Sequence, residues 1–450
     1  MGIVQQSVWG RCWIALYFFS IASCVVAGAV TIEIESLEDL KKIGNDPGYP
    51  LDGTYALIND IDASDTVNWN GGAGWILIGI DPGNPFCGTF DGQGHAITGL
   101  FMNSLDPDHG GGLFGSVTGT VKNLRVLDVN ITAPNTVGAV ARGVTGSLIN
   151  CHSSGVVCAY NCAGGLVGVN PESFRDTFLS RCSSSCKVVL RYGSSIPVFG
   201  GGLVGSSSAD IEECFATGSV IIPKQGAFYI GGLVGHFGEE VSLSRSYATG
   251  AVSGAFDVGG LVGLNYGTVD NCYSTGAVTG DDKVGGLVGE NYGALVACYA
   301  TGFVTGDMNT GGLLGWNANR VSFCYWNCFT SGQEDSNGGE GRTTDDMTWP
   351  YAVNTFTGWD FETVWAADEE HFINDGYPCL IQNAPILAHP ADINKDFRVV
   401  LSEAIAYLTG WQQGSNPMAY AIRAAYVWQN GEHYTYDSEE VPPVCWVLGP

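Results

Sequence analysis

GGLVGLNYGTVDNCYSTGAVTGDDKV (residues 259–284), GGLVGENYGALVACYATGFVTGDMNT (residues 285–310) and GGLLG (residues 311–315) follow one another without a gap. The copies match position by position with a period of 26 residues. A period of this length predicts a solenoid, because one unit cannot bury its apolar face alone and must stack on its neighbours.

Each unit contains three short β-prone runs separated by glycine-rich turns. In the unit marked by Leu261 these runs are Gly260–Leu264, Thr268–Ser274 and Ala277–Thr279. Short runs with no helical period between them predict coils of three strands that stack in parallel at ~4.8 Å. The L-x-x-L-x-L pattern of leucine-rich repeats is missing. We therefore expect an all-β chain with the architecture of a parallel β-helix, or β-solenoid.

The repeat can be followed upstream through the residue after each glycine pair, which we expect to point into the core. The marker residues are Leu113, Leu166, Leu203, Leu233, Leu261, Leu287 and Leu313, and Ala139 stands where a degenerate eighth copy belongs. We assign residues 106–330 to the repeats. The longest interval contains Asn170-Pro171-Glu172-Ser173, where we expect an inserted loop, because solenoids tolerate insertions at one place in the period.

A column of cysteines lies at or near eleven residues after the markers. Its members are Cys151, Cys182, Cys214, Cys272, Cys298 and Cys324. An apolar residue stands three positions before each cysteine, and we expect both positions to face inward, which requires a bend between them. One interpretation of the column is a metal or redox site. A stack of buried thiols is favoured, because no histidine shares the register.

Two further columns lie at the turn after the first run. Asparagines recur four residues after the marker, at Asn170, Asn265, Asn291 and Asn317. We expect left-handed backbone there and amide hydrogen bonds along the column. Beside them, Tyr266, Tyr292 and Trp316 either form a strip for sugar rings or, as we favour, shield the turn.

The sequence before the repeats resembles an export signal followed by a cap. Arg11, an apolar run over Cys12–Val26 and the small residues Ala27–Ala29 predict a signal peptide over residues 1–29. Ile21-Ala22-Ser23-Cys24 also fits a lipobox, which would make Cys24 a lipid anchor. No later segment could span a bilayer.

We assign residues 30–105 to an N-terminal cap and the first coil or coils. A short helix is expected after Ser36, with Leu37, Leu40 and Ile43 on one face and Gly44 at its end. Strands are expected at Tyr55–Ile58 and Trp75–Ile78, and a first coil at Gly88–Ile97.

After the repeats we expect a polar loop, a second cap and a small helical module. Residues 331–388 form the C-terminal cap, whose part from residue 345 should fold over the last coil. Residues 389–437 form the module and residues 438–450 a tail. Three C-x3-C pairs permit loop disulfides in an oxidising compartment, with undefined connectivity: Cys158/Cys162, Cys182/Cys186 and Cys324/Cys328.

The repeats GGLVG-x-N-x-G…NCYSTG…V resemble the GLUG-motif family of bacterial surface proteins. Sequences like those that usually surround such repeats are present on both sides: Leu57–Asp62, Gly88–Ile97, and Tyr325-Trp326-Asn327 with Gly341–Met347. The resemblance implies a right-handed parallel β-helix on an exported, cell-surface or secreted protein. It implies no agreed activity: some members are adhesin-like, and others carry the motif beside a zinc protease, whose His-Glu-x-x-His is absent here.

The C-terminal module contains a candidate calcium loop. Asp392, Asn394, Asp396 and Glu403 offer side-chain oxygens at loop positions 1, 3, 5 and 12, and Arg398 offers its backbone carbonyl at position 7. Phe397 replaces the turn glycine, and Val400 brings no oxygen at position 9. An acidic turn that caps a helix is the alternative. We favour Ca²⁺, because an exported protein meets millimolar calcium.

Helices are expected from Ser402 to Trp411 and from Asn416-Pro417 to about Gln429. The loop with its one following helix resembles half an EF-hand and the first half of a dockerin. This resemblance implies a cohesin-like or cell-envelope partner, although a second calcium loop is missing.

Charge and motif content limit the functions. The net charge of −27 disfavours nucleic acid and anionic membranes as partners. We therefore expect a non-catalytic exported protein that acts in adhesion or binds a carbohydrate or surface protein. The alternative is a polysaccharide lyase or hydrolase of the pectin-lyase-like type, which would need clustered carboxylates with a basic residue. The acids appear scattered, as at Asp257, Asp270, Asp282 and Asp307, with lone Lys283 or Arg320.

Overall fold

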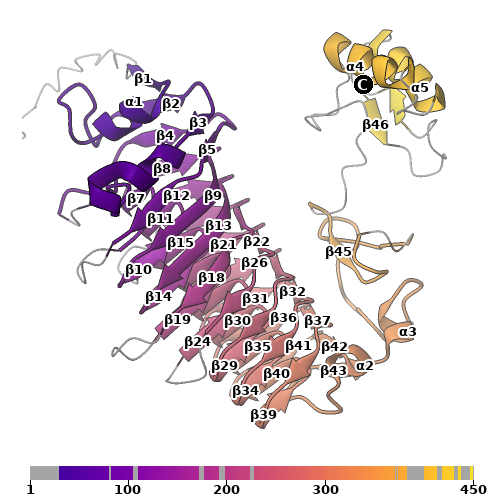
Figure 1. Cartoon of the computed structure of the whole chain (residues 1–450). Helices are drawn as coiled ribbons and strands as arrows, with labels where there is room; N and C mark the ends of the chain where they lie inside the picture. The colour runs from indigo at the N-terminus through magenta and orange to yellow at the C-terminus, as the bar shows by residue number, and fades with distance from the viewer. Residues whose placement is uncertain are drawn as a thin grey trace, which may run out of the picture.

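The computed structural model describes residues 30–80, 83–104, 110–171, 177–191, 198–222, 228–369, 371, 373–382, 400–412, 418–429, 434–436 and 446–448. Most of these residues form a parallel β-solenoid, as the repeat predicts (Figure 1). Strands at equivalent positions pair in register from coil to coil, for example Val262 with Val288 and Val269 with Leu295. The predicted all-β class is confirmed.

One coil contains five short strands where the sequence predicts three. In the coil of Leu261 they are β29 (Phe256–Gly259), β30 (Val262–Asn265), β31 (Thr268–Asp270), β32 (Tyr273–Ser274) and β33 (Val278–Thr279). The run predicted over Thr268–Ser274 is split at Asn271, which has a φ of 51°.

This left-handed residue recurs before the cysteine position in every repeat. The residues are Asn123, Asn150, Arg181, Glu213, Arg245, Asn271, Ala297 and Phe323, all with positive φ. The turn lets Val269 and Cys272, which are three residues apart, both point inward with 0 % of each residue exposed. The predicted bend is confirmed, and arginine, glutamate and phenylalanine occupy it as well as asparagine.

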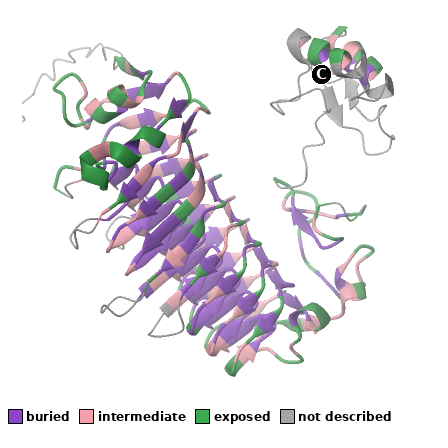
Figure 2. Cartoon of the chain, viewed as in Figure 1, coloured by how far each residue is buried: buried purple, intermediate pink, exposed green. Residues whose placement is uncertain are grey.

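The core is a continuous column along the solenoid axis (Figure 2). All eight marker residues are buried, as predicted, and so are the six cysteines of the column. Ser246 takes the cysteine position in one coil, where its hydroxyl accepts the backbone N–H of Cys214 at 3.0 Å. In the same way, the sulfur of Cys324 accepts the N–H of Cys298 at 3.4 Å. The column thus connects coils through weak polar contacts inside an apolar core.

The glycine pairs stand where coils approach most closely. A Cβ on Gly260 would lie 2.0 Å from the carbonyl oxygen of Gly286 in the next coil. A Cβ on Gly286 would lie 2.2 Å from that of Gly312. Because no side chain fits there, the repeat requires glycine at this position.

The asparagine column differs from its prediction in one respect. Asn265, Asn291 and Asn317 end strands without left-handed backbone, so that part of the prediction is wrong. The predicted amide ladder is present, because the Nδ2 of Asn265 donates to Asn291 at 2.8 Å and that of Asn291 to Asn317 at 2.8 Å. Asn265 also binds the backbone of Gly267, which closes the turn.

The N-terminal end is covered as predicted by a short helix, α1 (Leu37–Lys42). The hydroxyl of Ser36 accepts the N–H of Asp39, and Leu40 and Ile43 are buried in the solenoid core. Strand β2 (Thr54–Leu57) forms near the predicted position. Trp75–Ile78 is not a strand; only Gly74 and Ile78 form isolated bridges there.

The C-terminal cap is arranged differently from the prediction. The last coil is covered by the polar loop, where Ser336 accepts the N–H groups of Leu313 and Leu314. Residues 345–382 instead lie along the side of the solenoid, as Figure 1 shows for β45 (Cys379–Leu380). They pack on the stacked rings of Tyr273 and Tyr299 and on Tyr325 in the last coil. The position of residues 345–382 is therefore a correction: the stacked tyrosines on the flank give their aromatic side chains an apolar surface to pack against.

The C-terminal module contains the two predicted helices, α4 (Leu401–Gln412) and α5 (Met418–Gln429). Ala404, Ala421, Ala424 and Val427 are buried between and around them. Ile405 in α4 is 52 % exposed. Among the described residues, every helix is too short or too polar to cross a bilayer.

Candidate functional site

Two neighbouring sheets bring three charged side chains together on the outside of the solenoid. Asp257 lies in β29, Lys283 in β34 (Asp282–Gly285) and Glu290 in β35 (Val288–Asn291). Asp257 and Lys283 occupy the same position one coil apart, and both have left-handed backbone, with φ of 50° and 53°. We call these three residues the charged cluster.

Lys283 bridges the two acids. Its Nζ lies 2.8 Å from a carboxylate oxygen of Glu290 and 3.4 Å from one of Asp257. The hydroxyl of Tyr292 donates to the other oxygen of Glu290 at 2.9 Å. Only 8 % of Asp257 and 7 % of Glu290 is exposed, so both carboxylates are largely removed from water.

Burial alters the protonation of the cluster. Desolvation, together with a hydrogen bond to the neighbouring Glu290 carboxyl, raises the pKa of Asp257 to about 7, although Lys283 opposes the shift. Burial acts to lower the pKa of Lys283, but its contacts with Glu290 and Asp257 outweigh burial and raise that pKa. Near neutral pH the cluster therefore holds one titrating carboxyl beside a fixed ion pair.

Tyr266, Tyr292 and Trp316, which we expected to shield the turn and considered as a strip for sugar rings, form a row beside this cluster that we call the aromatic strip. The rings of Tyr266 and Tyr292 stack at 5.0 Å with an interplanar angle of 7°, and Trp316 follows at 5.0 Å with a tilt of 52°. Lys283 lies 6.0 Å from the Trp316 ring. Because Tyr292 lies between its two neighbours, the strip presents ring edges and hydroxyls rather than free faces. His236 extends it by one coil at 5.9 Å from Tyr266.

The scattered acids of the repeats do not all join the cluster. Asp282 accepts the amide of Asn309 at 2.7 Å, Asp270 accepts that of Asn271 at 2.8 Å, and Asp307 is exposed. Arg320 donates to the hydroxyl of Ser322 at 2.9 Å. Of the acids and bases noted in the sequence, Asp257 and Lys283 come together.

Glu290 was not expected from the sequence. Its signal is the difference between GGLVGLN and GGLVGEN, which places a carboxylate where the preceding coil has the buried Leu264. A charge at a strand position that is apolar one period earlier requires a partner from a neighbouring coil. Lys283 supplies it.

The predicted calcium ligands Asp392, Asn394, Asp396 and Arg398 lie outside the described residues. Glu403 lies in the first turn of α4, and its side chain is also outside them. In the part of the chain that the structure describes, His, Cys, Asp and Glu side chains form no group of three able to hold a metal ion. The twelve described cysteines are all free thiols.

The repeat itself decides the family resemblance. Residues 254–279 match the model of the GLUG motif. The chain carries the GLUG motif. This match covers the coil of β29–β33, which contributes Asp257 to the charged cluster. The resemblance is thus confirmed for the GLUG repeats, while the dockerin-like part stays a prediction.

Two curated relatives are similar to part of this chain. The chain is 37 % identical over 142 residues to halomucin of Haloquadratum walsbyi, which is 30 % of this chain and 2 % of halomucin. It is 29 % identical over 221 residues to an immunoglobulin A1 protease of Streptococcus sanguinis, which is 48 % of this chain and 11 % of that protease. The chain therefore spans a small part of both relatives.

Among solved structures, a putative immunoglobulin A1 protease from Bacteroides ovatus is similar, with a TM-score of 0.49 and 17 % identity. The similarity covers 78 % of this chain and 92 % of that one.

Proposed function

We propose that this GLUG solenoid is an exported surface protein that binds glycan along the face formed by the charged cluster and the aromatic strip. The observation that carries the proposal is Lys283 held between Asp257 and Glu290 on an outer wall, next to exposed tyrosine edges. Burying charges in this way costs free energy. The solenoid can form without a charge at this position, because the residue equivalent to Glu290 one coil earlier is Leu264. Carboxylates, an ammonium group and phenol hydroxyls match the many hydroxyl groups of a sugar chain.

Two further observations support an extracellular location. The predicted signal peptide would export the chain, and Cys24 would anchor it if the lipobox is used. The two curated relatives carry the names halomucin and immunoglobulin A1 protease. Adhesion through the solenoid and docking through the C-terminal module to a cohesin-like or cell-envelope partner follow as part of this proposal.

Cleavage of a polysaccharide is the second candidate function. The observation that favours it is the carboxyl of Asp257 with a pKa of about 7 beside the carboxylate of Glu290, since general acids work best near the ambient pH. We propose binding first, because the two carboxyls are bridged by Lys283 rather than separated by a space for a sugar ring.

One screen separates the two functions. The mature chain is applied to a glycan array and, in parallel, incubated with polysaccharides while released sugars are measured. We expect retention of a glycan without products, and a loss of affinity of roughly tenfold in Lys283→Met, because charge-assisted hydrogen bonds are lost. Lys122→Met, which removes an ion pair with Asp91 away from this face, should bind normally. Products that disappear in Asp257→Asn while binding persists would establish the enzyme instead.

A further inference from the structure

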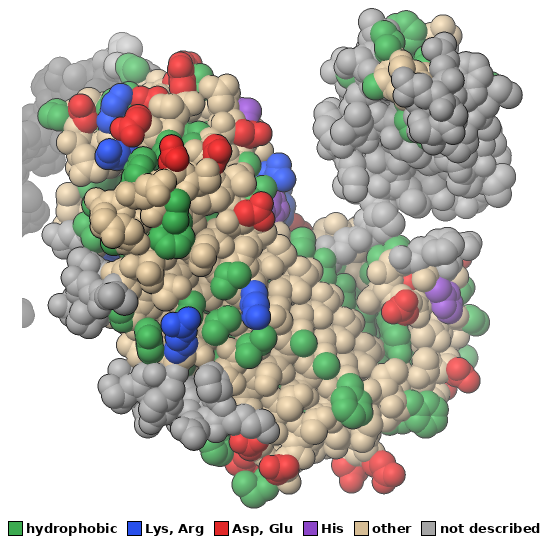
Figure 3. All heavy atoms as spheres, viewed as in Figure 1, with side chains coloured by type: hydrophobic (Ala, Val, Ile, Leu, Met, Phe, Trp, Pro, Cys, Tyr) green, Lys and Arg blue, Asp and Glu red, His purple; other side chains and the backbone are tan. Residues whose placement is uncertain are grey.

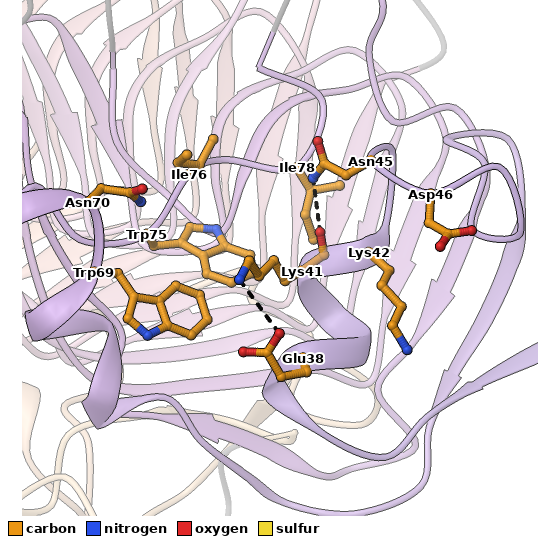
Figure 4. Close-up of a pocket in the computed structure, with 10 residues that line it drawn as sticks. All are labelled: Glu38, Lys41, Lys42, Asn45, Asp46, Trp69, Asn70, Trp75, Ile76 and Ile78. Carbon is orange, nitrogen blue, oxygen red and sulfur yellow. Dashed lines mark hydrogen bonds and ion pairs between the residues drawn. The ribbon is translucent and has the colours of Figure 1, made fainter.

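A cavity of about 570 Å³ lies at the N-terminal end of the solenoid, away from the charged cluster (Figure 4). One wall is α1, which contributes Glu38 and Lys41, and the opposite wall carries Trp69 and Trp75. Ile76, which is 56 % exposed, adds apolar surface at the rim. We call this cavity the α1 pocket.

A cation already occupies the aromatic wall of the α1 pocket. The Nζ of Lys41 lies 4.8 Å from the centre of the Trp69 ring and 3.5 Å from a carboxylate oxygen of Glu38. The ring of Trp75 stacks on that of Trp69 with their centres 6.0 Å apart, and the indole N–H of Trp75 donates to the carbonyl of Leu113 at 3.0 Å. An ammonium group therefore finds a ring face and a counter-charge together, which is how proteins recognise alkylammonium ligands.

Lys41 holds this place weakly. Its side chain is 55 % exposed and that of Glu38 is 69 % exposed, and they are three residues apart on a single helix. Ion pairs of this kind contribute little to stability. A ligand could displace Lys41 into solvent and take over its two contacts.

Of the remaining polar side chains that line the α1 pocket, Lys42 pairs with Asp39 at 2.8 Å and Asp46 accepts the N–H of Gly48 at 2.8 Å. The amide of Asn70 donates to the carbonyl of Gly74 at 2.7 Å, and that of Asn45 to the carbonyl of Lys41 at 2.9 Å. These amides are thus committed to the backbone rather than presented to ligand hydroxyls. The net charge of −27 also draws cations toward the chain, and Figure 3 shows acidic side chains gathered around the lysines at this end.

We infer that the α1 pocket binds an alkylammonium group, with Trp69 as its aromatic wall, Glu38 as its counter-ion and Lys41 as a built-in competitor. The ligand would be a small molecule or side chain that carries a quaternary or primary ammonium on an apolar stem. This site is independent of the glycan-binding proposal.

The test is a calorimetric titration of the mature chain with tetramethylammonium and choline at low ionic strength. We expect Lys41→Ala to bind both probes about two- to fivefold more tightly, because the competitor is removed. Glu38→Gln and Trp69→Ala should weaken binding by about fivefold or more, while Trp69→Phe should retain most of it. Trp316→Ala, in the aromatic strip, should leave ammonium binding unchanged even if it alters glycan binding.

Two results would overturn the inference. One is the absence of binding by both probes to the wild type and to Lys41→Ala, with circular dichroism showing that both are folded. The other is weaker binding in Lys41→Ala together with binding of acetate or glucuronate by the wild type, which would make the pocket an anion site that uses Lys41 directly.

Discussion

At the residue scale, the solenoid depends on side chains that repeat in register. Each marker leucine is fully buried in the core column that successive coils share, so a truncation leaves a cavity that the neighbouring coils cannot fill without breaking their own register. The same repetition limits what a coil can change. Where one coil departs from the pattern, as Glu290 does, a neighbour must compensate.

The first prediction concerns the central leucine of a middle coil. Leu287→Ala should lower the free energy of unfolding by about 2–5 kcal/mol, because Leu287 is fully buried. Denaturant unfolding followed by circular dichroism measures the change. Phe303→Ala is the control, since Phe303 is 58 % exposed and should cost little. Equal effects of the two substitutions would contradict the assigned register.

The second prediction concerns the pH dependence due to Asp257. Its pKa rises from the ordinary value of 3.8 to about 7 on folding, so the folded chain keeps a proton that the unfolded chain releases between these values. The contribution of this carboxyl to stability is therefore greatest at low pH and falls as the pH rises toward 7. Asp257→Asn should be more stable than the wild type at about pH 8, by on the order of 1–2 kcal/mol, and nearly equal at about pH 4.

Thermal unfolding of both proteins across this pH range measures the difference. Lys283→Met provides the matched comparison. Without the ammonium group the charged form of Asp257 loses its stabilising partner, so the free energy of unfolding of this variant should fall more steeply with rising pH than that of the wild type. If Asp257→Asn is instead less stable than the wild type at about pH 8, with the difference disappearing toward acid pH, the carboxyl is stabilised in its charged form and the account of the cluster is wrong.

At the scale of elements, the segment of residues 345–382 is held to the solenoid by aromatic contacts. Trp365 is fully buried, stacks on Trp359 at 4.4 Å and donates its indole N–H to Asn271 at 3.0 Å. Tyr299 donates its hydroxyl to the carbonyl of Pro378 at 2.6 Å. The segment thus shields a tyrosine ladder that would otherwise lie open on the flank.

The third prediction follows from this packing. Trp365→Ala should cost about 3–5 kcal/mol of the binding between the segment and the solenoid and release the segment before the coils unfold. Hydrogen exchange should show faster exchange at residues 365–382 and Tyr299, with the amides of β25 (Val234–Phe237) unchanged. Trp349→Ala is the control, because Trp349 is 37 % exposed. Faster exchange throughout the solenoid would mean that segment and coils unfold as one unit.

At the scale of the whole molecule, the chain combines a solenoid with a separate pair of short helices. Each coil contacts mainly its neighbours, so the stability of the solenoid accumulates along its length. The two helices contact each other, and their buried residues are small, such as Ala404 and Ala424. A module this small commonly needs a metal ion or another staple to fold.

The fourth prediction tests the calcium proposal in the mature chain. Addition of millimolar Ca²⁺ should stabilise the helical module, seen as an upward shift of a thermal transition and as slower hydrogen exchange in α4 and α5, without an effect on the coils. Asp392→Ala should abolish the shift, whereas Asp375→Ala, in the C-terminal cap, should preserve it. If Asp392→Ala responds to Ca²⁺ in the same way as the wild type, the ion does not bind in this loop.

The sequence by itself determined the coil. A period of 26 residues fixes which side chains stack on which, so the buried leucines, the cysteine column, the bend before each cysteine and the asparagine ladder could be predicted from spacing. These contacts can be predicted because each residue of the repeat contacts the equivalent residue of the next coil, one period away in the sequence.

Only the tertiary structure decided which residues of different columns contact each other and where the non-repeating segments pack. The charged cluster joins Asp257 and Lys283 from one sheet with Glu290 from another, and the angle between the sheets cannot be read from a spacing. The α1 pocket likewise joins Lys41 with Trp69 across two non-repeating segments. The side that residues 345–382 cover was decided by the row of stacked tyrosines, which forms a surface only once the coils lie on one another.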